Sequence, residues 1–113
     1  MHLTLATETA RLPGPPTEKY PDGAPFVVGL RHGTMSVELY APRGRDLQVP
    51  HAQDELYIVA TGRGDFLCGD RRVSFGPHDV LFAPAGVAHR FENFTADFST
   101  WVVFYGPSGG ERK

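Results

Sequence analysis

The sequence predicts a single all-β domain of the barrel or sandwich type, and two observations lead to this fold class. From Phe26 to Tyr105, short runs rich in valine, leucine and aromatic residues alternate with Gly, Pro, Asn and Asp, which is typical of short strands joined by turns. The chain has 113 residues with eight Phe, four Tyr and one Trp, enough apolar material for one core but not two. We expect an N-terminal arm over residues 1–25, the β-domain over 26–107 and a polar tail over 108–113.

The expected strands follow one another closely. The first two span residues 26–30 and 34–40, with a turn at 31–33 between them. The later ones span residues 47–51, 55–60, 65–68, 71–75, 79–83, 87–93 and 98–105, which makes about nine strands in all. In the arm, residues 7–12 are expected to form one short helix, because the prolines that begin at Pro13 prevent its continuation.

Composition and charge exclude several classes of function. The net charge is -2 with acidic and basic residues interspersed, so there is no electrostatic footprint for nucleic acid or an anionic membrane. No stretch reaches the ~18 apolar residues of a membrane span, and the start of the chain lacks the pattern of a signal peptide. The single cysteine, Cys68, cannot form an internal disulfide and fits a reducing compartment. We expect a cytoplasmic protein whose partners are neither nucleic acid nor membrane.

The first group of candidate site residues lies between Val49 and Gly62. Alternate side chains of an extended chain share a face, so one face would carry His51, Gln53, Glu55 and Tyr57 together with Val49 and Val59. A carboxylate buried on that face is costly unless it stays protonated or meets a cation. Two interpretations remain open: Glu55 is hydrogen-bonded to a core histidine, or it shares a metal ion with imidazoles.

A second imidazole comes from the segment that follows Pro84. Pro84 and Gly86 predict a tight turn, and the strand after it would present Val87, His89 and Phe91 to one face. Two histidines and one glutamate would then converge from neighbouring strands. Tyr57 and Phe91 share faces with these residues, so we expect them to form walls of the pocket.

At these positions the sequence resembles the cupin superfamily, over about residues 34–105. The second motif of that family, Pro-x-Gly-x-x-His-x-x-x-Asn, is present as Pro84, Gly86, His89 and Asn93. The glycine that usually precedes the Asp of this motif is replaced by His78. We interpret His78 as a turn residue, because histidine adopts a positive φ at modest cost.

The first cupin motif is incomplete. It usually has His-x-His, three or four residues, Glu, six residues, and Gly. Glu55 and Gly62 have the family spacing, which places His51 at the second histidine and Val49 at the first. An alternative alignment puts Gln53 at the second histidine, but it leaves only one residue before Glu55 and is too short for the family spacing.

The resemblance implies both a fold and a metal site. The implied fold is a cupin-type antiparallel β-barrel, a jelly-roll-like double sheet. The implied site holds one divalent transition metal with His51, Glu55 and His89, and Gln53 is a further candidate contact to the metal or to a ligand. Two histidines and one carboxylate leave coordination positions open, and they suit Fe, Mn, Zn, Ni or Cu without selecting among them.

The resemblance also implies a class of function. It favours a metal-dependent enzyme, in the first place an oxygenase, that acts on a small organic molecule. The alternatives are an isomerase or lyase in which Glu55 moves a proton, and a binding or sensory module without turnover. We expect a homodimer, because cupins commonly pair and because pairing would cover an exposed sheet edge.

Overall fold

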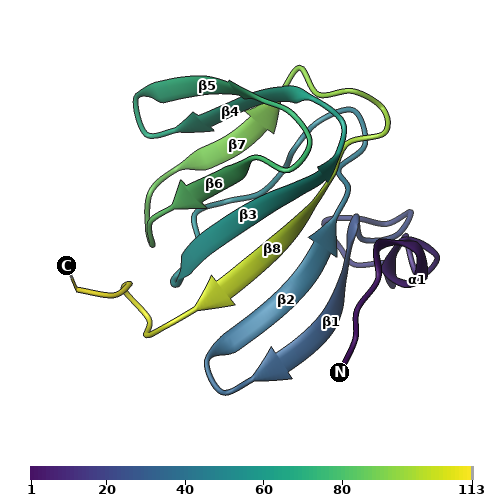
Figure 1. The fold of residues 1–113 in the computed structure, drawn as a ribbon, viewed down its shortest axis with the longest axis horizontal. Coiled ribbons are helices and arrows are strands. Elements are labelled where there is room, and N and C mark those ends of the chain that lie inside the picture. The colour runs from purple at the N-terminus through teal and green to yellow at the C-terminus, as the bar shows by residue number, and fades with distance from the viewer. Residues whose placement is uncertain (113) are drawn as a thin grey trace.

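The computed structural model describes residues 1–112 and consists of two antiparallel sheets that face each other (Figure 1). The five-stranded sheet has the order β1-β2-β8-β3-β6, and the three-stranded sheet has the order β5-β4-β7. Their bounds are β1 Phe26–His32, β2 Met35–Tyr40, β3 Asp54–Thr61, β4 Gly64–Cys68, β5 Arg71–Phe75, β6 Val80–Ala83, β7 His89–Glu92 and β8 Ser99–Tyr105. The predicted all-β double sheet is confirmed.

Alternation along β3 determines where the core lies. Glu55, Tyr57 and Val59 are at most 1% exposed, whereas Ile58 between them is 38% exposed. Tyr57 meets the aromatic rings of the opposite sheet, Phe66 on β4 and Phe91 on β7, at centroid distances of 5.6 and 5.0 Å. The inner face of β3 therefore carries both the core and the predicted site residue Glu55.

The first part of the N-terminal arm packs against β1, where Leu3 contacts Gly29 and Arg11 donates to the Val28 carbonyl. Its helix α1, Leu5–Thr9, begins earlier than the predicted span of 7–12, because the Thr4 hydroxyl caps it by accepting a hydrogen bond from the Thr7 N–H at 3.1 Å. Leu3 lies so close to Gly29 of β1 that a Cβ there would be 2.8 Å from Leu3 Cδ1. Within residues 1–112, no helix has the length and apolar character needed to cross a membrane.

The prediction of a strand over residues 47–51 is wrong. These residues belong to the loop that joins β2 to β3, so the domain has eight strands rather than nine. Val49 is 60% exposed and does not share the buried face of Glu55. Pro50 has no N–H for a ladder, and the Asp46 carboxylate accepts the Gln48 N–H at 3.0 Å, a local bond that competes with strand pairing.

Two turns have the backbone conformation that the sequence motifs require. His78 has a φ of 73°, which confirms its interpretation as a turn residue in place of glycine. Gly62 has a φ of 88°, and a Cβ at this position would lie 2.5 Å from Phe98 Cα. The motif glycine is therefore required both by its conformation and by the close approach of the chain before β8.

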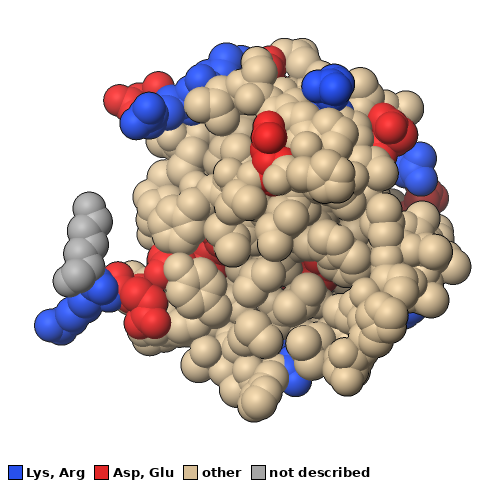
Figure 2. Space-filling model, in the orientation of Figure 1, with Lys and Arg blue, Asp and Glu red and all other residues tan. Residues whose placement is uncertain are grey.

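Charged side chains are dispersed over the face of the molecule shown in Figure 2. Acidic and basic groups are mixed around the rim of this face, and its middle is largely uncharged. Some of the molecule's charges pair directly, as Arg72 does with Asp65 at 2.8 Å and with Glu92 at 2.7 Å. The field over the face shown is therefore of mixed sign.

Candidate metal centre

Three side chains that can bind a metal converge from three segments of the chain. Glu55 lies on β3, His89 lies on β7 of the opposite sheet, and His51 lies in the loop before β3. Each offers a ligand atom, and these atoms all lie within 4.8 Å of one another. The Gly86 N–H donates to the His51 carbonyl at 2.9 Å, so the turn before β7 is attached to the loop that carries His51.

His89 is oriented as a metal-binding histidine would be. Its ring nitrogen Nδ1 lies 2.8 Å from the Val87 carbonyl and can only donate to it, which assigns the lone pair of the neutral ring to Nε2. Nε2 is buried and has no hydrogen bond among the described residues, although it lies 2.9 Å from Glu55 Oε2. A buried nitrogen without a partner next to a carboxylate is suited to a shared cation.

The surroundings of His89 favour positive charge. Burial by itself lowers the pKa of His89, but the Glu55 carboxylate and the Val87 carbonyl outweigh it, and the pKa is raised above its usual value. Glu55 is 1% exposed. The carboxylate therefore creates a negative potential inside the core that a proton or a metal ion can neutralise.

Tyr57 orients the Glu55 carboxylate by a hydrogen bond from the core side of the site. Its hydroxyl donates to Glu55 Oε1 at 2.9 Å. Burial, together with the negative charge of Glu55, raises the pKa of Tyr57 well above its usual value. The phenol thus keeps its proton and acts as a hydrogen-bond donor at any ordinary pH.

His51 is the accessible member of the group. Its side chain is 35% exposed, and Nε2 lies 3.8 Å from Glu55 Oε1. The ring packs edge-on against Phe104 of β8, with centroids 5.0 Å apart and an interplanar angle of 70°. Phe104 therefore limits the orientation of His51 while solvent can still reach the ring.

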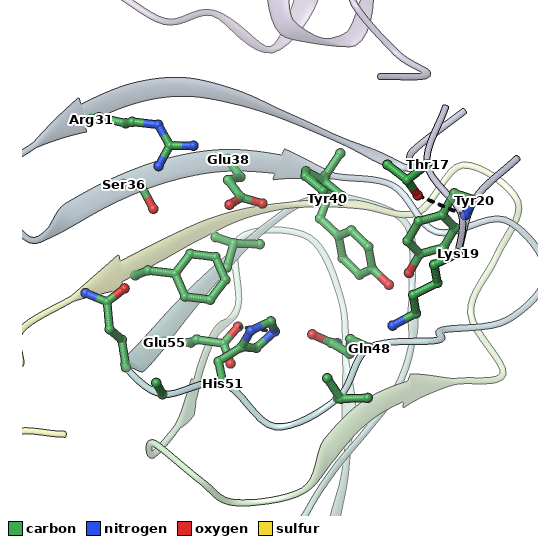
Figure 3. A pocket seen from close by; sticks show the side chains of 16 residues that line it. Thr17, Lys19, Tyr20, Arg31, Ser36, Glu38, Tyr40, Gln48, His51 and Glu55 are labelled. Atoms are coloured by element: carbon green, nitrogen blue, oxygen red, sulfur yellow. Dashed lines mark hydrogen bonds and ion pairs between the residues drawn. The ribbon is translucent and has the colours of Figure 1, made fainter. Parts of the chain in front are cut away.

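A cavity of about 550 Å³ opens beside His51 and Glu55 (Figure 3). This volume suits a small organic ligand. Phe26, Val102 and Phe104 supply apolar walls, and the polar lining comes from the arm, β1, β2 and the loop before β3: Lys19, Tyr20, Arg31, Ser36, Glu38 and Gln48. Any ligand in this cavity would have His51 and Glu55 at one wall.

Glu38 of β2 faces the same cavity from another wall. Figure 3 shows its carboxyl directed into the space above Glu55. Burial raises the pKa of Glu38 to about 7; the Arg31 guanidinium opposes this shift and the Glu55 carboxylate adds to it. Near neutral pH, Glu38 is therefore an acid that can give or take a proton.

The structure places three further predicted site residues as follows. Gln53 lines the cavity, but its amide nitrogen donates to the Thr34 and Gly106 carbonyls at 2.8 and 3.0 Å. Tyr57 and Phe91, which we expected to wall the pocket, lie beneath it in the core and are 0% and 1% exposed. Tyr57 still contacts the site, through its bond to Glu55.

Sequence reasoning missed Glu38, Asp46 and Gln48. Glu38 shares an alternating face with Tyr40, a buried core residue, and this shared face was a signal that could have placed Glu38 inward. Asp46 had no such signal, because one of its partners is the N–H of Phe91, 45 positions away in the sequence. Gln48 was assigned to a strand that does not form.

Comparison with known proteins identifies the family. The model of the family described as "Cupin domain" matches residues 36–105. The uncharacterized protein SCO3923 of Streptomyces coelicolor is 42% identical over 88 residues, which are 76% of this chain and 83% of that protein. The chain therefore belongs to the cupin family.

Solved structures agree with the fold. A cupin-2 domain protein of Rhodospirillum rubrum superposes with a TM-score of 0.60 at 20% identity, covering 75% of this chain and 64% of that chain. A cupin 2 conserved barrel domain protein of Salinispora arenicola has a TM-score of 0.60 at 22% identity, covering 72% of this chain and 74% of that chain. This chain thus spans less than two thirds of the Rhodospirillum protein, and at these identities the likeness concerns the fold alone.

Proposed function

We propose that this protein is a metal-dependent enzyme that holds one divalent transition metal with His51, Glu55 and His89 and acts on a small organic molecule in the adjacent cavity. The observation that carries the proposal is the buried Nε2 atom of His89. It lies 2.9 Å from Glu55 Oε2, so a proton or a metal ion must lie between the two atoms, and the neutral ring, with its proton on Nδ1, leaves that place to a metal ion. A metal ion between these two ligands would satisfy both.

The donor set fits such an ion. Two ligand atoms bonded to one ion at about 2.1 Å and at right angles lie about 3 Å apart, close to the 2.9 Å between His89 Nε2 and Glu55 Oε2. Val49, at the position where the family has its first histidine, offers no ligand atom and is 60% exposed. The proposed centre therefore has three protein ligands, which leaves positions for water or substrate.

In the proposed reaction, the metal ion and the side chains of the protein contribute different parts of the chemistry. A bound divalent metal supplies Lewis acidity, and iron in a two-histidine, one-carboxylate site supplies oxygenase chemistry. Tyr57 keeps the Glu55 carboxylate in place by donating to it. The apolar walls of the cavity offer a contact surface to the carbon skeleton of the ligand, and Arg31 and Lys19 of the cavity lining offer positive charge to an anionic group.

We favour an oxygenase, because three protein ligands leave open positions on the ion. An isomerase or lyase is the second candidate, since Glu38 has a pKa of about 7 in the same cavity and can move a proton near neutral pH. A binding or sensory protein without turnover would use the same cavity but would need no such acid.

Oxygen consumption distinguishes these functions. The Fe(II)-loaded protein, screened against small organic acids, diols and thiols, is expected to consume O2 only when its substrate is present. Activity that persists under strict anaerobiosis would favour the isomerase or lyase instead. Ligand binding by the metal-loaded protein, with neither O2 uptake nor product, would contradict the enzyme and favour the sensory module.

We also propose that the protein is a homodimer that pairs through the outer face of β3 and β6. Ile58, Val80 and Phe82 are 38%, 61% and 47% exposed on this face, and β6 is an edge strand of the sheet. Sedimentation equilibrium is expected to give twice the monomer mass, and Phe82→Glu is expected to give a folded monomer, because a charge at the centre of an apolar interface is costly to desolvate. A monomeric wild-type protein at micromolar concentration would contradict this assignment.

A further inference from the structure

The loop before β3 contains a carboxylate that contacts two other parts of the fold. Asp46 Oδ1 accepts hydrogen bonds from the Tyr40 hydroxyl and, at 3.0 Å, from the Gln48 N–H. Asp46 Oδ2 accepts from the Gln48 amide nitrogen at 2.6 Å and from the Phe91 N–H at 2.8 Å. These four bonds occupy all four acceptor positions of the carboxylate.

Two of these bonds fix the segments that carry the histidines. Phe91 lies two residues after His89 on β7, so its bond to Asp46 attaches that strand to the loop. Gln48 lies three residues before His51, and its N–H bond to Asp46 shapes the loop between them. Asp46 thus connects the loop that carries His51 to the strand that carries His89.

A third bond leads to Glu55 through two side chains. Because the amide nitrogen of Gln48 faces Asp46, its carbonyl oxygen must face the Tyr57 hydroxyl, which lies 3.1 Å away. Tyr57 therefore receives no proton from Gln48 and can only donate. Its other acceptor is Glu55 Oε1 at 2.9 Å. The single Tyr57 proton is shared between the Gln48 and Glu55 oxygens, so Gln48 and Tyr57 connect Asp46 to Glu55 as neighbours in contact and not as a one-way series of donors.

We infer that Asp46 is a positioning residue that holds His51, Glu55 and His89 at their mutual distances before a metal ion binds. This inference rests on the proposed metal function. The physical reason is preorganisation: ligands held in place lose little conformational freedom on binding, and hydrogen-bonded outer partners of metal ligands typically contribute 10- to 100-fold to affinity. Asp46 acts on the two histidines through the backbone, and on Glu55 through Gln48, which accepts from the same Tyr57 hydroxyl that donates to Glu55.

A purely structural role for Asp46 makes a different prediction. If Asp46 only stabilised the loop, its loss would lower the free energy of unfolding but leave the metal affinity of the folded protein unchanged. The positioning role predicts that the affinity of the folded protein changes as well. The coordination geometry reported by the metal's own spectrum should then change with it.

Titration with Co2+, followed by its visible absorption, tests this inference. Asp46→Asn is expected to lower the Co2+ affinity of the folded protein about 10- to 100-fold and to alter the absorption spectrum, because its amide nitrogen, in whichever orientation, cannot accept the backbone N–H bonded at that position, of Phe91 or of Gln48. Gln48→Leu keeps the backbone N–H bond to Asp46 but removes the side-chain contacts with Asp46 and Tyr57, so the Tyr57 hydroxyl loses a neighbour that holds it in place, and a smaller change in Co2+ affinity and spectrum is expected. The matched control is Asp97→Asn, which removes a carboxylate bonded to Thr95 in a turn that is not part of the site, and it is expected to bind Co2+ as the wild type does.

The outcomes separate this inference from the proposed function. Wild-type affinity and spectrum in folded Asp46→Asn would overturn the positioning role while leaving the metal site intact. If Asp46→Asn does not fold, wild-type affinity and spectrum in folded Gln48→Leu would overturn the positioning role, since Gln48 makes two of the four bonds of Asp46. Failure of the wild-type protein itself to bind Co2+ would overturn the proposed metal function, and the inference with it.

Discussion

Replacing His89 with alanine is expected to abolish stoichiometric metal binding and any turnover that depends on it. His89 supplies one of three ligand atoms, and its loss should lower metal affinity by more than the roughly 100-fold that outer-partner mutations can cost. The variant also leaves the Glu55 carboxylate, 1% exposed, without its neighbour, which is expected to reduce the free energy of unfolding by about 3 kcal/mol. Metal affinity by competition with a chelator, measured on protein shown to be folded by circular dichroism, checks this prediction.

Two further variants show whether a loss of metal binding in His89→Ala comes from the loss of a ligand. His51→Ala removes a ligand whose side chain is 35% exposed, so it should lower metal affinity with little loss of stability. His32→Ala removes an exposed histidine at the end of β1 and should leave both properties unchanged. Metal binding that survives in both His51→Ala and His89→Ala would show that these residues are core histidines rather than ligands.

Replacing Glu38 with glutamine is expected to stabilise the metal-free protein above pH 7 but not at pH 4. The pKa of Glu38 is about 7 in the folded chain against 4.5 when unperturbed. As the pH rises from about 4.5 to 7, the unfolded chain loses this proton before the folded chain does, so the folded state is progressively destabilised. The full difference is at most about 3.4 kcal/mol, and solvent at the cavity mouth reduces it to about 1–2 kcal/mol. Urea unfolding at both pH values measures it.

The charged groups around Glu38 determine how this test is run. Arg31 on β1 and Glu55 on β3 influence its pKa, and Lys19 and His51 line the same cavity. Because a metal beside Glu55 would also change the field, the protein must first be stripped with a chelator. The matched control is Glu18→Gln in the arm, which should show no such pH-dependent gain. An equal effect of Glu38→Gln at pH 4 and pH 8 would mean that the Glu38 carboxyl titrates normally.

Most of the fold could be predicted from the sequence because its signals are local. The alternation of Glu55, Tyr57 and Val59 identified the buried face of β3, and the strands expected at residues 65–68 and 71–75 are observed as the antiparallel pair β4 and β5. The strand predicted at residues 47–51 was wrong because Asp46 and Pro50 favour a loop, a preference that an apolar pattern does not reveal. The start of α1 was misplaced because the capping role of Thr4 was overlooked.

The candidate site was predictable only where a motif fixed its spacing. His51, Glu55 and His89 follow from two short patterns, and the structure brings their ligand atoms together. The residues around them depend on contacts between distant segments. Asp46 accepts a hydrogen bond from Phe91 only when the loop between β2 and β3 lies against β7. Glu38 lines the cavity beside Glu55 only when β2 and β3 belong to the same sheet. No spacing within the sequence contains that information.

The most direct test of the central claim is the metal content of the purified protein. Elemental analysis after incubation with divalent metals and removal of the excess is expected to give about one equivalent of a transition metal per chain for the wild type, and close to none for His89→Ala. A folded wild-type protein that retains no more metal than His89→Ala does, and that shows no metal binding by titration, would contradict the account.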